Sequence, residues 1–207
     1  MKNDREYRSL NIEVETRNEA GDPSYIVRGY ASTFEPYVLF EDDGIQYKEQ
    51  IDPHAFDETD MSDVVFRVDH EGQVYARSSA GTLKVGFDEH GLYDEADLSK
   101  TAKARGLFED IAAGNYPKQS FAFTVTEDKY DKKEHLRTIL KVGKLYDVSP
   151  VSFPANPGTE LDIATRSYFD GVIEMEQAER LESEKRERLK AQLALKIKIM
   201  EMENGRD

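Results

Sequence analysis

The stretch of sequence that decides the fold is 120-SFAFTVT-126 followed, after a charged interval, by 136-LRTILKVGKLYDV-148. Both runs are rich in the β-branched, aromatic and aliphatic residues that strands favour. The interval at 127–134, EDKYDKKE, is almost entirely charged and is typical of a solvated turn. The sequence therefore predicts a β-hairpin in which 120–126 and 136–148 are the two strands.

Further short strands precede this hairpin. Four segments combine β-branched and aromatic residues with turn signals at their ends, namely 25–34, 64–68, 81–87 and 91–98. The turn DEHG at 88–91 joins the last two of these and predicts a second hairpin. After the main hairpin, the segment 149–158 contains three prolines, so we expect it to be extended or looped rather than regular.

Two segments predict helices. In 101–113 apolar residues recur at helical spacing, Gly114 ends the pattern, and Ser99 or Thr101 is placed to cap the start. From 173 to 204 the chain has no Gly or Pro and carries apolar residues on two adjoining stripes among many charges, which predicts one long charged helix. We therefore divide the chain into a mostly β domain, 1–165, and a helical tail, 166–207.

Composition disfavours several classes of protein. The 207 residues suffice for one ordinary domain with an extension. A net charge of −14 argues against nucleic-acid and membrane-surface binding, because both surfaces are anionic. The chain has no cysteine, no apolar signal segment and no run approaching about 20 apolar residues, so we expect a cytosolic protein without disulfides.

The sequence gives no reason to expect a metal or a cofactor. None of the four histidines pairs with another at a spacing of four residues, and no set of Cys and His ligands occurs. A glycine-rich phosphate loop is also absent from the sequence. We therefore predict no metal site and no cofactor site.

Two residues are candidates for hydrolytic chemistry. His70 follows the strand at 64–68, where an imidazole is well placed for proton transfer. Ser120 begins the first strand of the main hairpin, which gives a nucleophile a fixed backbone. Taken alone, His70 is better explained as a turn residue and Ser120 as a residue on the outer face of a sheet.

Strand pairing adds Asp147 as a third candidate. If the hairpin tip centres near 131–133, Ser120 lies across from the region of Lys144, and Asp147 is a few residues away on the neighbouring strand. A carboxylate there is able to orient an imidazole and to stabilise it when charged. An ordinary aspartate at the sheet edge is the alternative. His135 and Glu71 fit the orienting role less well, the first because it lies in the charged tip and the second because sequence neighbours in a strand point apart.

These residues lie in segments that together resemble one family. The segments occur in the family's order and are 28-RGYASTF-34, 51-IDPHAF-56, 68-VDHE-71, 81-GTL-83, 91-GLY-93, 119-QSFAF-123 and 145-LYDVSPVSFPANP-157. In this respect the chain resembles the prohead (capsid maturation) proteases of tailed bacteriophages, a family thought to share ancestry with herpesvirus assemblin. It departs from the family pattern at Asp69, Glu71, His54 and Ala122, where Asn, Asp, Gly and Gly are usual.

The resemblance implies a fold and an activity. The fold would be α+β, mostly an antiparallel β-sheet or barrel of the assemblin type with a few packed helices, plus the long charged C-terminal helix. The activity would be that of a serine endopeptidase without cofactors. Ser120 would act as the nucleophile, His70 as the general base and Asp147 as the residue that orients His70.

The resemblance also implies partners and a place of action. The substrates would be the scaffold segment of the major capsid protein and the protease itself, cut inside the assembling prohead in the cytoplasm of the bacterial host. The tail at 166–207 would serve assembly, targeting or self-association. The main alternative is a non-enzymatic capsid assembly or scaffolding factor, which the long charged helix fits equally well. An unrelated β-rich hydrolase would need a different nucleophile, and none is better placed than Ser120.

Overall fold

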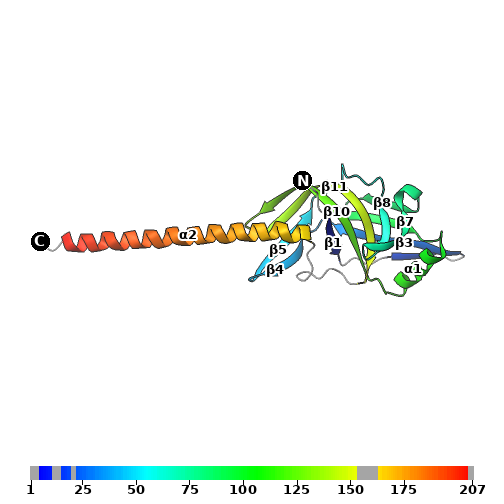
Figure 1. The fold of residues 1–207 in the computed structure, drawn as a ribbon, viewed down its shortest axis with the longest axis horizontal. Coiled ribbons are helices and arrows are strands. Elements are labelled where there is room, and N and C mark those ends of the chain that lie inside the picture. The colour runs from blue at the N-terminus through cyan, green and yellow to red at the C-terminus, as the bar shows by residue number, and fades with distance from the viewer. Residues whose placement is uncertain (1–4, 11–14, 20–21, 153–162, 205–207) are drawn as a thin grey trace. The chain divides into compact units, whose positions relative to one another are not determined.

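The computed structural model describes residues 5–10, 15–19, 22–152 and 163–204. The chain divides into two compact units, Met1–Asp162 and Ile163–Asp207. In its described residues the first unit consists mostly of strands with one α-helix, and those of the second form one long helix (Figure 1). The predicted α+β class with a long C-terminal helix is thus confirmed. The functional division at 165 stays a prediction.

The larger sheet is built around the predicted hairpin. Among the described residues it has seven strands, with five in the order β1-β10-β11-β5-β4 and with β6 and β7 attached to β11. The bounds of these strands are β1 Glu6–Leu10, β4 Tyr37–Asp42, β5 Ile45–Ile51, β6 Val65–Val68, β7 Glu71–Arg77, β10 Lys118–Asp131 and β11 Leu136–Val151. The long strand β11 pairs in parallel with β5 at its start and with β6 near its end, so the sheet branches.

The smaller sheet is antiparallel throughout. In the described part of the chain it has four strands in the order β2-β3-β9-β8, with bounds β2 Glu15–Glu19, β3 Asp22–Thr33, β8 Leu83–Phe87 and β9 Gly91–Asp97. Apolar residues of both sheets and of the helix α1 (Ala102–Ala112) form one buried cluster, which includes Val27, Leu92, Phe121 and Leu145. The described strands form no closed barrel, so the barrel form of the prediction is wrong. The likeness to assemblin stays a prediction.

The register of the main hairpin differs from the predicted one. Ser120 lies opposite Ser149, not near Lys144. At the hairpin tip Asp131 pairs with Leu136. Four register irregularities between Ala122 and Asp128 then move the partner of Ser120 further along β11 than an even count from the tip would place it. Since each bulge adds one unpaired residue to a strand, counting back from the tip cannot give the correct partner. The shift brings Asp147 closer to Ser120 than predicted.

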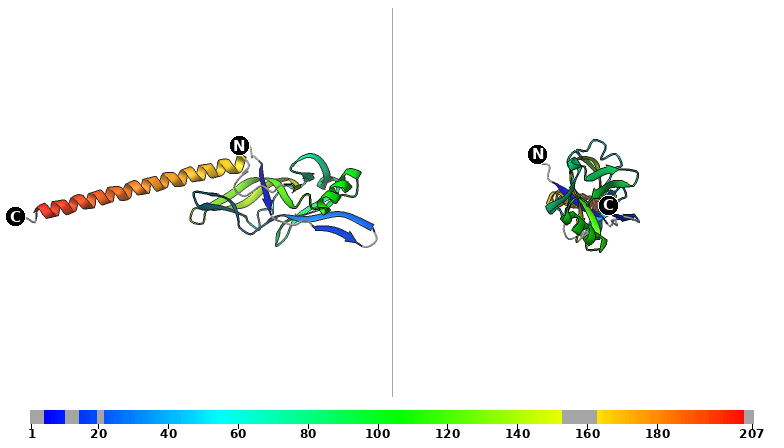
Figure 2. Two further views of the ribbon diagram at one scale, coloured as in Figure 1. Left: turned by 90° about the horizontal axis from the view of Figure 1, so that it is seen from below. Right: turned by 90° about the vertical axis from the view of Figure 1, so that its right-hand side faces the viewer.

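The helices begin and end for identifiable reasons. The hydroxyl of Thr101 accepts a hydrogen bond of 3.0 Å from the N–H of Ala104 at the start of α1, and Gly114 follows the helix with a left-handed φ of 84°. The second helix, α2, runs over Ile163–Asn204 and is continuous along its length in the left view of Figure 2. It begins earlier than the predicted position 173 because Gly171 is tolerated inside it, at a cost of about 1 kcal/mol.

Other predictions near the C-terminal end of the β unit are partly wrong. The strand β11 continues through Ser149 and Pro150 to Val151, where we predicted irregular structure. Residues 153–158 of that predicted loop lie outside the described residues. Among the described helices, none is long and apolar enough to cross a membrane.

Candidate active site

A tight turn between β6 and β7 positions His70. Asp69 and His70 both adopt left-handed backbone conformations, with φ values of 49° and 59°. This conformation is uncommon in residues other than Gly, but Asn, Asp and His adopt it more often than the rest, which suits Asp69 and His70. The N–H of Asp69 donates to the carbonyl of Pro150, and its carboxylate accepts from the N–H and hydroxyl of Ser152 at 2.8 and 2.6 Å. The turn is therefore fastened to the end of β11.

A second contact holds the turn from the other side. Nη1 of Arg67 donates to the carbonyl oxygen of His70 at 2.7 Å. This bond satisfies a backbone acceptor that the turn removes from the β ladder. With both contacts in place, the imidazole projects toward β10 and β11.

The structure brings the three predicted residues together. Nε2 of His70 lies 2.7 Å from Oγ of Ser120, and Nδ1 lies 2.6 Å from Oδ1 of Asp147. Ser120 and Asp147 are each 2% exposed, whereas the His70 side chain is 18% exposed. A hydrogen bond donated by Nδ1 to the carboxyl group of Asp147 leaves Nε2 to accept the hydroxyl proton of Ser120. This is the geometry required for a nucleophile, its base and a residue that orients the base.

Strand register explains why these side chains meet. Ser120 and Ser149 are directly opposite each other, and Asp147 lies two residues before Ser149 on the same face of β11. β6 pairs in parallel with β11 beside Asp147, so the turn that follows β6 carries His70 over that face. The hydroxyl of Ser149 donates to Oδ1 of Asp147 at 2.8 Å and fixes the carboxylate.

Sequence reasoning missed the contribution of the N-terminal strand β1. Ser9 pairs with Ser120, and the hydroxyl of Ser120 donates to the carbonyl oxygen of Arg8 at 2.6 Å. The ring of Tyr7 meets the His70 imidazole edge-on, with centroids 4.8 Å apart. The hydroxyl proton of Ser120 therefore has two acceptors, His70 and Arg8. The N-terminal segment carries no motif that indicates this. Ser149 was also missed, although its two-residue spacing from Asp147 would have placed both on one face of the strand.

A buried ion cluster attaches β1 to the rest of the sheet. The guanidinium of Arg8 contacts Glu6 and Glu49, and Arg137 contacts both carboxylates as well. Burial alone would raise the pKa of Glu6, but the two guanidinium groups lower it to about 2. Although burial disfavours its charge, the carboxylate of Glu49 raises the pKa of Arg8 well above its usual value. Glu6 and Arg8 thus stay charged near neutral pH.

The weaker candidates lie in other contacts. Nδ1 of His135 is 3.2 Å from the hydroxyl of Tyr130 at the hairpin tip. Glu71 lies just after the turn, while Nδ1 of His70 faces Asp147. In the described part of the chain no group of three or more His, Cys, Asp or Glu side chains is arranged to hold a metal ion. The absence of a metal or cofactor stays a prediction.

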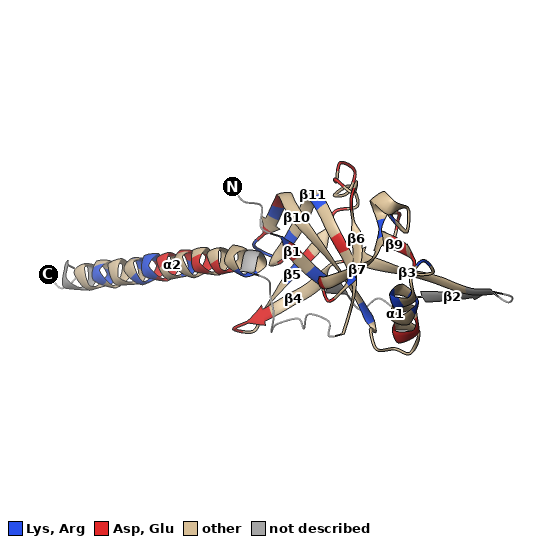
Figure 3. Cartoon of the chain, turned by 45° about the vertical axis from the view of Figure 1, so that its right-hand side comes forward, with Lys and Arg blue, Asp and Glu red and all other residues tan. Residues whose placement is uncertain are grey.

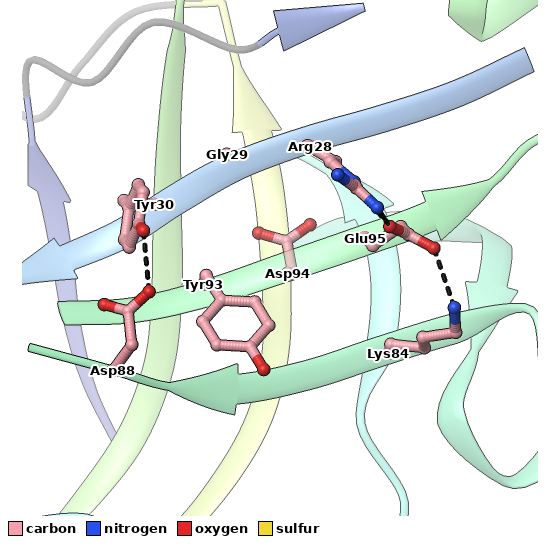
Figure 4. A pocket seen from close by; sticks show the side chains of 8 residues that line it. All are labelled: Arg28, Gly29, Tyr30, Lys84, Asp88, Tyr93, Asp94 and Glu95. Carbon is pink, nitrogen blue, oxygen red and sulfur yellow. Dashed lines mark hydrogen bonds and ion pairs between the residues drawn. The ribbon is translucent and has the colours of Figure 1, made fainter. Parts of the chain in front are cut away.

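A pocket of about 500 Å³ lies elsewhere on the β unit, over β3, β8 and β9 (Figure 4). Five of its polar side chains are paired with one another: the Tyr30 hydroxyl donates to Asp88 at 2.8 Å, and Glu95 accepts from Lys84 and Arg28. Asp94, which also lines the pocket, accepts instead from Gln119. None of the three candidate catalytic residues lines it. We therefore do not assign the pocket to the hydrolytic site.

Comparison with known proteins gives one match. A family model described as caudovirus prohead serine protease matches residues 11–171, a span that includes His70, Ser120 and Asp147. No curated protein and no solved structure matches the chain.

Proposed function

The chain belongs to the caudovirus prohead serine protease family, and we propose that Ser120 is its nucleophile, His70 its general base and Asp147 the residue that orients His70. The observation that carries this proposal is the continuous series of contacts from Asp147 through His70 to Ser120, 2.6 and 2.7 Å long. Membership of the family supports a serine peptidase in general, and these contacts support the individual roles.

The mechanism is acyl transfer. Oγ of Ser120 attacks the carbonyl carbon of the substrate peptide bond while its proton passes to Nε2 of His70. The carboxylate of Asp147 stabilises the imidazolium that results. His70 then donates the proton to the departing amine, and the C–N bond breaks to leave an acyl-enzyme. A water molecule, deprotonated by His70, hydrolyses the ester and restores Ser120.

Family membership supports a proposal for the substrate and the place of action. The proposed substrates are the scaffold segment of the major capsid protein and the protease itself, and the proposed site of cleavage is the assembling prohead in the cytoplasm of the bacterial host. The major capsid protein would then be both the substrate and the assembly partner.

The helical tail at 166–207 is proposed to direct the protease into the shell or to mediate self-association. Eight of its large apolar side chains in the described residues are each more than 40% exposed, namely Met175, Leu181, Leu189, Leu193, Leu195, Ile197, Ile199 and Met200. From Arg188 to Met200 all charged residues are basic, whereas acidic residues predominate before Arg188 (Figure 3). An exposed apolar and basic segment suits an acidic partner surface. The same feature favours the alternative function, a scaffolding factor that does not cleave.

Co-expression with the neighbouring capsid protein tests the proposal. Mass measurement should show truncated capsid protein with the wild-type chain and full-length protein with Ser120→Ala, because loss of a nucleophile lowers the rate about 10⁶-fold. Ser79→Ala, which removes an exposed serine hydroxyl outside the site, is the matched control and should cleave normally. Normal cleavage by Ser120→Ala would favour another nucleophile, and no cleavage by any variant would favour the scaffolding alternative.

A further inference from the structure

A buried polar pair lies directly behind the candidate nucleophile. Gln119 precedes Ser120 in β10, so its side chain leaves the opposite face of the strand and enters the space between the two sheets. There Nε2 of Gln119 donates a hydrogen bond to Oδ1 of Asp94 in β9. Both residues are 1% exposed. The pair therefore joins the strand of Ser120 to the smaller sheet.

Two atoms of this pair are left without partners. Oδ2 of Asp94 and Oε1 of Gln119 are both buried, and within the described part of the chain neither has a hydrogen-bond partner. If Asp94 were ionised, both atoms would be acceptors and could not bond to each other. A single proton on Oδ2 turns the carboxyl group into a donor toward Oε1, and then both atoms are satisfied.

Among the described residues, the neighbours that face Asp94 carry no compensating charge. Its cross-strand neighbours on the same face are Gly29 in β3 and Val85 in β8, neither of which is ionisable. The flanking Glu95 and Tyr93 of β9 point to the other face, where Arg28 and Lys84 bind Glu95 and Tyr30 binds Asp88 (Figure 4). From β10, the residue that reaches Asp94 is Gln119. Burial raises the pKa of Asp94 to about 8, although the Gln119 hydrogen bond acts in the opposite direction.

We propose that Asp94 is a neutral carboxylic acid that forms two hydrogen bonds with the side-chain amide of Gln119 and thereby positions the strand that carries Ser120. Gly29 completes the arrangement, because a Cβ atom at this position would collide with Oε1 of Gln119. Asp94 and Gln119 are positioning residues. Their effect on cleavage rests on the proposed role of Ser120, whereas the protonation of Asp94 does not.

Protonation makes folding stability depend on pH. The pKa of Asp94 is higher in the folded chain than the unperturbed value of about 3.9. The folded state therefore binds one more proton than the unfolded state between these two values, and stability falls as pH rises from about 4 to about 8. Asp94→Asn replaces the O–H donor with N–H, so the same two hydrogen bonds form at every pH.

Urea unfolding of the full chain between pH 5 and pH 9 tests the protonation. The unfolding constant of the wild type, divided by that of Asp94→Asn, should rise by nearly tenfold per pH unit up to about pH 8 and then level off. Asp88→Asn, in the turn between β8 and β9, is the matched control and should show no such slope, because the hydrogen bonds from His90 and Tyr30 lower the pKa of Asp88. A ratio for Asp94→Asn that is independent of pH would overturn the proposal.

A second measurement covers the case in which Asp94→Asn does not fold. Carboxyl ¹³C resonances of the wild-type chain, titrated by NMR, should include one aspartate that titrates near pH 8. If all aspartates are ionised by pH 6, the proposal is wrong.

Cleavage of a peptide that spans an identified processing site tests the positioning role. Asp94→Ala should lower kcat/KM about 100-fold, since small displacements of a reacting group have effects of this size, and Asp94→Asn should restore it. Equal activity of wild type and Asp94→Ala would overturn the positioning role. If Ser120→Ala cleaves normally, the proposed function fails, and the urea and NMR results still decide whether Asp94 is protonated.

Discussion

Two buried polar clusters flank the strand of Ser120, and they shift the pKa of a carboxyl group in opposite directions. In the cluster under β1, two guanidinium groups face Glu6 and lower its pKa to about 2, against the effect of burial. In the cluster between the sheets, an amide faces Asp94, and burial raises its pKa to about 8. Burial is common to both, so the facing group decides whether the carboxyl is charged.

Asp147 is a third buried carboxyl group, and it faces an imidazole. We expect it to orient His70 and to stabilise the imidazolium, because it contacts Nδ1 of His70 at 2.6 Å. Asp147→Asn should therefore lower kcat about 10⁴-fold, because the amide favours the wrong tautomer of the imidazole. Steady-state cleavage of a peptide substrate measures the effect.

The matched control for Asp147→Asn is Asp94→Asn. It makes the same chemical change in the cluster between the sheets and should leave kcat near the wild-type value. Equal, small effects of the two variants would show that Asp147 has no special role.

Disrupting the ion cluster of Glu6, Arg8, Glu49 and Arg137 should lower the free energy of unfolding more than disrupting the Asp94–Gln119 pair. Arg137→Ala leaves Glu6 and Glu49 with one guanidinium, and breaking a buried ion cluster costs about 3–5 kcal/mol of unfolding free energy. Urea unfolding at pH 7 measures this loss. Lys141→Ala removes an exposed ion pair with Glu127 and should change stability by less than about 1 kcal/mol. A loss below 1 kcal/mol for Arg137→Ala would mean that the cluster does not hold β1.

Opposite pKa shifts predict opposite pH windows. The pKa of Glu6 is lower in the folded chain, so its contribution to stability is complete above about pH 4.5 and is lost as pH falls toward about 2. In Glu6→Gln the free energy of unfolding should therefore fall less steeply as pH decreases below about 4.5. Its dependence on pH between pH 6 and pH 8 should be unchanged. If Glu6→Gln loses stability at low pH as steeply as the wild type, other carboxyl groups cause that loss.

The smallest effect is expected at Tyr7. Its ring edge packs on the His70 imidazole, an arrangement worth about 0.5–1.5 kcal/mol. Tyr7→Leu should lower kcat/KM about 2- to 12-fold, and Tyr7→Phe, which keeps the ring, should retain most of the activity. If kcat/KM falls equally in Tyr7→Phe and Tyr7→Leu, the contribution comes from the Tyr7 hydroxyl group and not from the ring contact.

The sequence predicts the central hairpin because its apolar residues and its charged turn are local signals. It also indicates His70, Ser120 and Asp147 through their segments, and the structure brings their side chains together. Their catalytic roles stay a prediction.

Other features depend on contacts that are distant in the sequence. β1 was not predicted because its inward residues, Glu6 and Arg8, are charged and only become suitable for burial when Glu49 and Arg137 face them. The position of Asp94 opposite Gln119 arises from packing between two sheets, for which no periodic signal exists.

The most direct test of the central claim is labelling with a fluorophosphonate, which forms a covalent bond to an activated serine hydroxyl. Mass spectrometry of the digested full chain should find one adduct, on Ser120, and none in His70→Ala, because the base that activates the hydroxyl is gone. An adduct on a different serine, or capsid-protein cleavage by a chain whose Ser120 remains unlabelled, would contradict the assignment of Ser120 as the nucleophile.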